Sequence, residues 1–111
     1  MFAYLIRRTP MAAVAALAAA SLGGAAKAPS VVTIGNFTFA APVVTVPVGA
    51  TVTWVNGDDV PHTVVATDKS FRSKVLDTDD RFSFTFTRAG SYDYFCSIHP
   101  HMTGKVVVTA S

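Results

Sequence analysis

Residues 81–96 read RFSFTFTRAGSYDYFC, and this stretch decides the expected fold. Phenylalanine alternates with serine or threonine from Phe82 to Thr87, which is the period of a strand with one buried face. Residues 88–90 then form a turn, and tyrosines alternate with other residues from Tyr92 to Phe95. The stretch therefore predicts two β-strands joined by a short turn.

Similar runs of β-branched and aromatic residues lie on both sides of this stretch, at 31–40, 43–56, 62–67 and 105–110. Gly35 and Asn36 mark a turn or bulge in the first run, and 47–50 divides the second into two strands. Residues 68–80 are irregular, apart from a short strand expected near Val75 and Leu76. No window after the N-terminal segment has a helical period. About seven short strands with Gly, Pro and Asn turns predict an all-β sandwich or small barrel.

The N-terminal segment has a different composition. Arg7 and Arg8 precede an apolar run at 11–22, and the small-residue stretch GGAAKAPS follows at 23–30. This order is typical of a secretory signal peptide. A membrane anchor would need about 18 or more apolar residues, and this run is shorter. We therefore expect a signal peptide at 1–28, cleaved near 26–28, and one domain at 29–111 with no membrane span after signal removal.

Removing the signal peptide changes the charge of the chain. The whole sequence has a formal net charge of +2, whereas the part from Pro29 onward has six basic and seven acidic side chains. No basic stripe remains, which argues against nucleic-acid binding. Cys96 is the only cysteine, so it cannot form an internal disulfide. An unpaired cysteine in an exported protein is reactive, paired between molecules or bound to metal.

The candidate metal ligands are concentrated near the C-terminus. Cys96, His99 and Met102 have the spacing Cys-x2-His-x2-Met, in a loop between the strand ending at Cys96 and the strand expected from Lys105. A thiolate, an imidazole and a thioether suit a soft, redox-active ion. His62 follows a proline at the start of another strand and is the candidate for the fourth ligand. Two histidines and one cysteine, with a weak axial methionine, form the ligand set of a blue-copper centre.

Other interpretations of these residues remain open from the pattern alone. Cys96 would be inert if it were simply a buried thiol, and Met102 would then be an ordinary core residue. Structural zinc sites more often use two or more cysteines. A catalytic thiolate would need a basic partner and a substrate pocket. We expect His101 to project outward and Trp54 to lie in the core.

The acidic pair Asp58 and Asp59 lies in a short polar segment between two expected strands. We expect the two carboxylates to form a solvated turn, and a contribution to partner recognition is the alternative.

Three segments carry a resemblance to a known family: TVTWVNGDDVPHTV at 51–64, FTFTRAGSYDYFC at 84–96 and CSIHPHMTGKVVV at 96–108. Together they resemble the cupredoxins, the small blue copper proteins that include plastocyanin, pseudoazurin and amicyanin. The resemblance covers residues 30–109. The short Cys-x2-His-x2-Met loop, with Pro100 after the second histidine, is most similar to that of the amicyanins.

The resemblance implies a Greek-key β-sandwich of about eight strands that holds one copper ion, cycling between Cu(I) and Cu(II). It implies that His62, Cys96 and His99 are the equatorial ligands and that Met102 is the axial ligand. The sequence departs from the family directly after His62, where plastocyanin and amicyanin have an asparagine and this chain has Thr63. A threonine side chain cannot supply the two donors of an amide.

We expect the protein to be a periplasmic, monomeric type 1 copper protein that shuttles single electrons and is not an enzyme. The route of export, Sec or twin-arginine, is left open by the sequence. Its partners would be transient redox proteins, and the resemblance to amicyanins implies an amine dehydrogenase and a c-type cytochrome. The alternative is an exported copper-binding module for copper delivery or buffering. Reversible redox chemistry would favour the first function, and ready copper transfer would favour the second.

Overall fold

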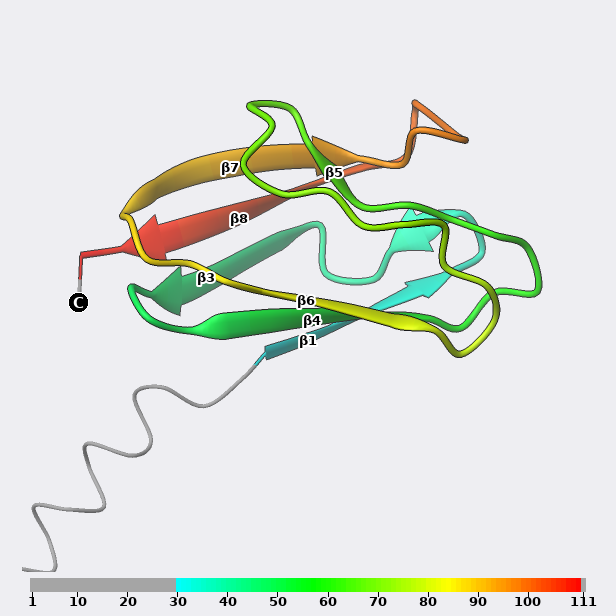
Figure 1. The fold of residues 1–111 in the computed structure, drawn as a ribbon, viewed down its shortest axis with the longest axis horizontal. Helices are drawn as coiled ribbons and strands as arrows, with labels where there is room; N and C mark the ends of the chain where they lie inside the picture. The colour runs from blue at the N-terminus through cyan, green and yellow to red at the C-terminus, as the bar shows by residue number, and fades with distance from the viewer. Residues whose placement is uncertain (1–29, 111) are drawn as a thin grey trace, which may run out of the picture.

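The computed structural model describes residues 30–110, so the predicted signal peptide at 1–28 lies outside the described residues. In this part of the chain eight strands form two four-stranded sheets that face each other (Figure 1). The strands are β1 (Ser30–Gly35), β2 (Thr38–Phe39), β3 (Val43–Pro47), β4 (Thr51–Asn56), β5 (Val65–Ala66), β6 (Arg81–Thr85), β7 (Gly90–Phe95) and β8 (Thr103–Thr109). None of the residues from 30 to 110 forms a helix that is long and apolar enough to cross a membrane.

The strands are ordered β2-β1-β4-β6 in the first sheet and β3-β8-β7-β5 in the second. β1 runs parallel to β4, and β3 runs parallel to β8, while the other neighbours are antiparallel. The strands predicted on either side of the 88–90 turn, β6 and β7, belong to different sheets, so this connection crosses the sandwich. The predicted all-β Greek-key sandwich is confirmed.

The pairing of β4 with β6 explains the phenylalanine pattern that the sequence shows. Trp54 lies opposite Phe82 on the inner face of the first sheet. On the outer face, the hydroxyl groups of Thr53 and Ser83 are 2.7 Å apart. Alternation between apolar and polar residues thus separates the core from the surface, as predicted.

An aromatic cluster fills the space between the sheets. Trp54 is fully buried, and its ring centroid lies 5.4 Å from that of Tyr94, 5.7 Å from that of Phe82 and 5.6 Å from that of Phe71. Phe71 comes from the irregular stretch 68–80, so this stretch is part of the core rather than a loose loop. Each large aromatic side chain buries about 150–250 Å² of surface, so this cluster is a major part of the core.

The strand predicted at 62–67 is shorter in the structure, where β5 contains only Val65 and Ala66. His62 instead forms an isolated bridge with Leu76, and their backbone groups exchange two hydrogen bonds of 3.1 and 2.8 Å. The backbone N–H of Val64 donates to the Ser73 hydroxyl at 2.8 Å. Residues 71–76 therefore fold back along residues 62–66, and the short strand predicted near Val75 is reduced to the bridge at Leu76.

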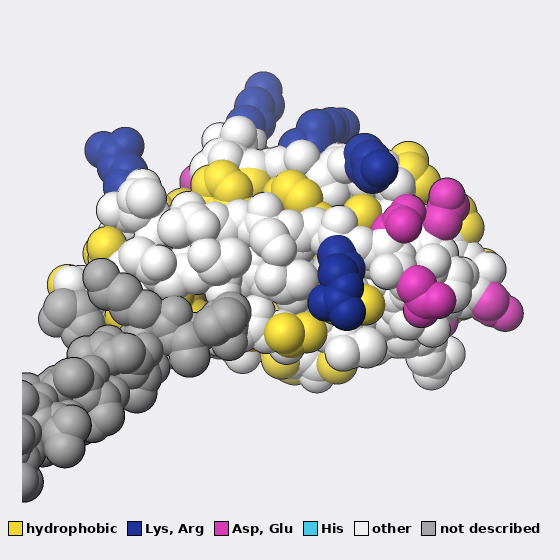
Figure 2. Space-filling view, turned by 60° about the horizontal axis from the view of Figure 1, so that its bottom comes forward, with side chains coloured by type: hydrophobic (Ala, Val, Ile, Leu, Met, Phe, Trp, Pro, Cys, Tyr) yellow, Lys and Arg dark blue, Asp and Glu magenta, His cyan; other side chains and the backbone are white. Residues whose placement is uncertain are grey.

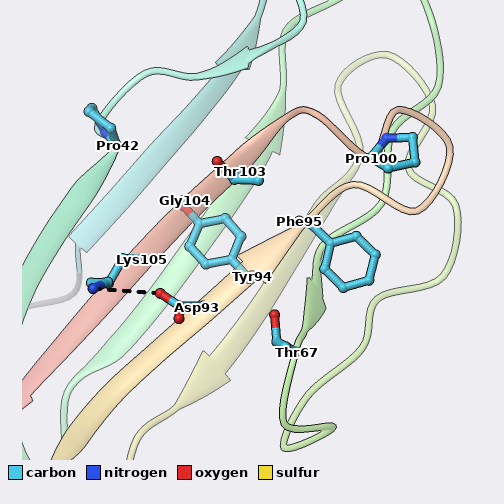
Figure 3. Close-up of a pocket in the computed structure, with 9 residues that line it drawn as sticks. All are labelled: Pro42, Thr67, Asp93, Tyr94, Phe95, Pro100, Thr103, Gly104 and Lys105. Carbon is cyan, nitrogen blue, oxygen red and sulfur yellow. Dashed lines mark ion pairs between the residues drawn. The ribbon is translucent and has the colours of Figure 1, made fainter.

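Gly104 allows the second sheet to hold a large aromatic ring. Gly104 lies opposite Tyr94 in the pairing of β7 with β8, and the ring of Tyr94 lies against it (Figure 3). A Cβ atom at position 104 would collide with the Cζ and hydroxyl atoms of Tyr94. The neighbouring pair, Lys105 and Asp93, points away from the core and forms an ion pair of 3.7 Å. Only glycine fits at position 104 while Tyr94 keeps this position.

We expect Gly104→Ala to lower the free energy of unfolding by about 1–3 kcal/mol, because Tyr94 is held by Trp54 and Phe39 and cannot move without repacking the core. Denaturant unfolding measures the change. Gly35→Ala is the matched control, since a Cβ atom there would meet nothing within 4 Å. Equal stability of the Gly104→Ala variant and the unchanged protein would contradict the importance of this contact.

Candidate metal centre

Two segments far apart in the sequence bring three donor atoms together at one end of the sandwich. His62 lies between β4 and β5, and Cys96 and His99 lie in the loop between β7 and β8. The Nδ1 atoms of the two histidines are 3.3 Å apart, and each lies 3.7 Å from the Cys96 sulfur. The structure thus brings together three of the four predicted ligands.

These three atoms fit a transition-metal ion. Bonds of about 2.0 Å to nitrogen and about 2.3 Å to sulfur place the donors around a trigonal ion roughly 3.5–3.8 Å apart. The observed separations of 3.3–3.7 Å are close to these values. Two imidazoles and one thiolate are also ligands that copper prefers. The donor set and its spacing therefore fit the copper ion that the sequence predicts.

The loop that carries Cys96 is closed by its own backbone hydrogen bonds. The N–H of His99 donates to the carbonyl of Cys96 at 3.2 Å, and the N–H of Met102 donates to the carbonyl of His99 at 2.9 Å. The N–H of Cys96 donates to the carbonyl of Met102 at 3.0 Å. These bonds make a tight turn in which Met102, the fourth predicted ligand, is buried on the same loop as the other two.

The surroundings of Cys96 favour the thiolate. Burial alone would raise the pKa of this thiol, but hydrogen bonds outweigh burial and lower the pKa to about 6. The contacts that lower it are, in order of effect, those with the backbone N–H of Thr63, the His62 ring, the backbone N–H of Ile98 and the His99 ring. The Thr63 N–H lies 3.4 Å from the sulfur. Because the thiolate is the form that binds metal, the site is prepared for a cation.

Asp58 orients the His62 ring, so the prediction of a solvated turn is wrong for this residue. Its carboxylate is 2.8 Å from His62 Nε2, and its side chain is only 13% exposed. It also accepts hydrogen bonds from the backbone N–H groups of Asn36 and Phe37, at 2.8 and 3.0 Å. These contacts lower the pKa of Asp58, with the largest effect from Phe37, followed by His62 and Asn36. Because the carboxylate binds Nε2, the Nδ1 atom of His62 is left to face the other two candidate ligand atoms.

Phe37 covers the centre, and the sequence analysis did not single it out. It lies in the turn between β1 and β2, and its ring contacts that of His99 at 4.9 Å and that of His62 at 5.6 Å. Its φ of 59° is unusual for an aromatic residue, and the residue is 49% exposed. The bond from its N–H to Asp58 holds this conformation. Nothing in the strand pattern distinguishes such a residue from an ordinary turn residue.

Two further sequence predictions are confirmed. His101 is exposed and is not among the three clustered donors, and Trp54 is buried in the core. One hollow lies beside the ligand loop, between Pro100 and residues of β7 and β8 (Figure 3). A smaller hollow lies over the centre itself and is lined by Phe37, Ile98, His99, Pro100, His101 and Met102.

Comparison with known proteins gives consistent results. A family model described as copper binding proteins of the plastocyanin/azurin family matches residues 26–109. Amicyanin of Paracoccus versutus is 43% identical over 83 residues, which are 70% of this chain and 63% of the relative. The amicyanin-alpha of Methylorubrum extorquens is 38% identical over 104 residues, which are 86% of this chain and 87% of the relative.

Among solved structures, a purple cupredoxin from Nitrosopumilus maritimus is similar to this chain, with a TM-score of 0.70 and 35% identity. The match covers 72% of this chain and 99% of that protein. The chain spans 63% of the length of the two Paracoccus amicyanins that it matches.

The state of the Cys96 thiol can be followed by its ultraviolet absorbance in copper-free protein. We expect the thiolate to appear with a midpoint near pH 6, well below the value of about 8.5 for a free cysteine. Cys96→Ser provides the background signal from the tyrosines. A midpoint in the ordinary range of cysteine would contradict the effect assigned to the surrounding donors.

We expect Asp58→Asn to lower the denaturant midpoint of the copper-free protein at neutral pH, because the ionised carboxylate makes charge-assisted hydrogen bonds. The folded-state pKa of Asp58 is lowered, so its contribution is present above the unfolded-state pKa of about 3.9 and is lost as the pH falls. Unfolding curves between acid and neutral pH measure this difference. Asp59→Asn, which changes the exposed neighbouring carboxylate, is the control and should leave the midpoint almost unchanged.

Proposed function

The chain belongs to the plastocyanin/azurin family of copper-binding proteins, and on this basis we propose that it is a type 1 copper protein that carries single electrons between redox partners. The proposed equatorial ligands are His62, Cys96 and His99, and the proposed axial ligand is Met102. The observation that carries the proposal is the triangle of two imidazole nitrogens and one sulfur, 3.3–3.7 Å apart, around a thiol with a lowered pKa.

Bound copper would supply a one-electron couple between Cu(I) and Cu(II). The protein would supply a fixed geometry, since His62 and Cys96 are fully buried and both are held by hydrogen bonds. The His62 ring is fixed by Asp58, and the Cys96 sulfur accepts the backbone N–H of Thr63. Side chains restrained in this way would rearrange little when the charge of the site changes, which favours rapid electron transfer.

His99 is the proposed point at which the electron leaves. It is the only half-exposed member of the donor triangle, and the apolar side chains of Phe37, Ile98 and Pro100 surround it. Phe37 and Ile98 are both well exposed for large apolar residues. Transient redox complexes use interfaces below about 1,200 Å², so a small apolar surface of this kind would be sufficient.

The surface charges are unevenly distributed. Carboxylates gather at one end of the domain, whereas most of the Lys and Arg side chains visible on the same face lie elsewhere (Figure 2). Asp59 lies in the loop after β4, and Asp77, Asp79 and Asp80 lie in the loop before β6. Hydrogen bonds between Asn56 and the backbone of residues 79 and 80 join the two loops. Such an asymmetry would orient an approaching charged partner.

The proposal includes export to the periplasm by the signal peptide at 1–28, a monomeric domain at 29–111, and transient protein partners. By analogy with amicyanins, which are among the relatives of this chain, the partners would be an amine dehydrogenase and a c-type cytochrome. With four protein ligands assigned, the centre keeps no position for a substrate, so we assign no enzyme reaction.

Copper delivery or buffering is the alternative function. A delivery protein must release its ion to an acceptor, which is easier when the ligands are exposed. Burial of His62 and Cys96 favours a resident ion and therefore electron transfer.

The proposed centre predicts an intense visible absorption band in the Cu(II) form, because the Cys96 thiolate would bind the ion directly. We expect Cys96→Ser and His62→Ala to lose this band. His101→Ala should keep it, because His101 is exposed and outside the donor triangle. A visible spectrum recorded during copper titration makes the measurement, and a colourless Cu(II) form of the unchanged protein would refute the proposal.

Two further measurements on the same samples distinguish electron transfer from copper delivery or buffering. Reversible oxidation and reduction in voltammetry, with copper retained in the presence of a competing chelator, supports an electron carrier. Rapid loss of copper to the chelator, without a reversible couple, would support delivery or buffering instead.

A further inference from the structure

Thr63 joins the two ligand-bearing segments through its hydroxyl group. The residue is 5% exposed, and its Oγ1 atom accepts the backbone N–H of Ser97 at 2.7 Å. The same atom lies 2.7 Å from the Ser97 hydroxyl and 3.8 Å from the Cys96 sulfur. One hydroxyl therefore contacts both residues that begin the ligand loop, across 33 and 34 positions of sequence.

The protons available to this group limit its hydrogen bonds to two arrangements. The Thr63 hydroxyl has one proton and two lone pairs, and one lone pair already accepts the Ser97 N–H. In the first arrangement Ser97 donates its hydroxyl proton to Thr63, and Thr63 donates its own proton to the sulfur. In the second, Thr63 donates to the Ser97 hydroxyl, and the sulfur receives nothing from this side chain.

The first arrangement uses the stronger acceptor. Hydrogen bonds to a charged acceptor are about twice as strong as those between neutral groups, and the Cys96 sulfur is negative as a thiolate. Ser97 is exposed, so its hydroxyl can rotate freely to donate to Thr63. Both lone pairs of Thr63 then accept, and its proton is left for the sulfur.

We propose that Thr63 and Ser97 form a hydroxyl pair that holds the two ligand segments together and directs the Thr63 proton to the Cys96 sulfur. Both are positioning residues, because neither is assigned as a copper ligand. The proposal rests on the proposed copper centre only in treating this sulfur as a metal-bound thiolate. The contacts between the segments are present without any metal.

Two consequences follow from the hydroxyl pair. The joined segments should stabilise the copper-free domain by about one hydrogen bond, since the Thr63 hydroxyl is buried. The bond to sulfur withdraws electron density from the thiolate, which favours the electron-rich Cu(I) form. The reduction potential of the copper protein should therefore be higher with this bond than without it.

The test compares Thr63→Val, Thr63→Ser, Ser97→Ala and the double variant Thr63→Val/Ser97→Ala with the unchanged protein. Thermal unfolding of copper-free protein gives Tm, and voltammetry of copper-loaded protein gives the reduction potential. Thr53→Val is the matched control, because Thr53 forms a similar 2.7 Å hydroxyl pair with Ser83 on the outer face of the first sheet. It should leave the reduction potential unchanged.

We expect Thr63→Val to lower the Tm of the copper-free protein by about 4–8 °C and to lower the reduction potential of the loaded protein. Thr63→Ser should have nearly the same Tm and reduction potential as the unchanged protein, because it keeps the hydroxyl. Ser97→Ala should lower Tm in the presence of Thr63 but have little further effect in Thr63→Val. It should leave the reduction potential unchanged, because the Thr63 proton still goes to the sulfur.

Three results would overturn the proposal. An unchanged Tm in Thr63→Val would show that the hydroxyl does not hold the segments together. Additive losses of Tm in the double variant would show that the two hydroxyls act independently. A rise in reduction potential in Ser97→Ala would show that Thr63 donates to Ser97 in the unchanged protein. A failure of the copper centre itself appears separately, as a missing visible band in the unchanged protein.

Discussion

The pairing of β5 with β7 places the two ligand-bearing segments side by side, and the rest of the centre depends on it. Val65 lies opposite Phe95, and Ala66 lies opposite Tyr94. His62 lies three residues before Val65, and Cys96 follows Phe95 directly, so this short ladder sets the distance between them. A shift of one residue would turn every side chain of β5 to the opposite face of the sheet. Two residues of ladder are a weak constraint alone, so other contacts must fix the register.

Those other contacts come from segments that are not strands. Residues 71–76 pair with residues 62–66 through the backbone and insert Phe71 into the aromatic core. Asp58 connects the β1–β2 turn to His62, and the Thr63 hydroxyl connects His62's neighbour to the ligand loop. Hydrogen bonds from residues 71–76, from Asp58 and from Thr63 thus hold the centre in place. Phe71 joins the first of these segments to the aromatic core. A small domain without a disulfide gains its rigidity near the site in this way.

The sequence predicted those features that follow from local pattern or from the type of ligand. Alternation identified the strand β6 and the buried Trp54, and the Cys-x2-His-x2-Met spacing identified the ligand loop. The position of His62 after a proline at the start of a strand made it the candidate for the fourth ligand, and the family resemblance supported this choice. The roles of Asp58 and Phe37 were missed, because they depend on contacts across 21 and 22 residues between a carboxylate and backbone N–H groups. Such contacts leave no period in the sequence, and an acidic pair in a polar loop is usually solvated.

The electrostatics of the donor triangle explain why the site needs both these hydrogen bonds and a bound cation. Two imidazole nitrogens 3.3 Å apart both face a buried sulfur that hydrogen bonds favour as a thiolate. Without a cation, these three atoms have mainly one another as partners, and a buried polar atom left without a partner is costly. A soft cation satisfies all three at once, so its binding would stabilise the folded domain by mass action. The hydrogen bonds from Asp58 and Thr63 therefore have two effects. They hold the three ligand atoms together when no ion is bound, and they fix the coordination geometry that a bound ion must adopt.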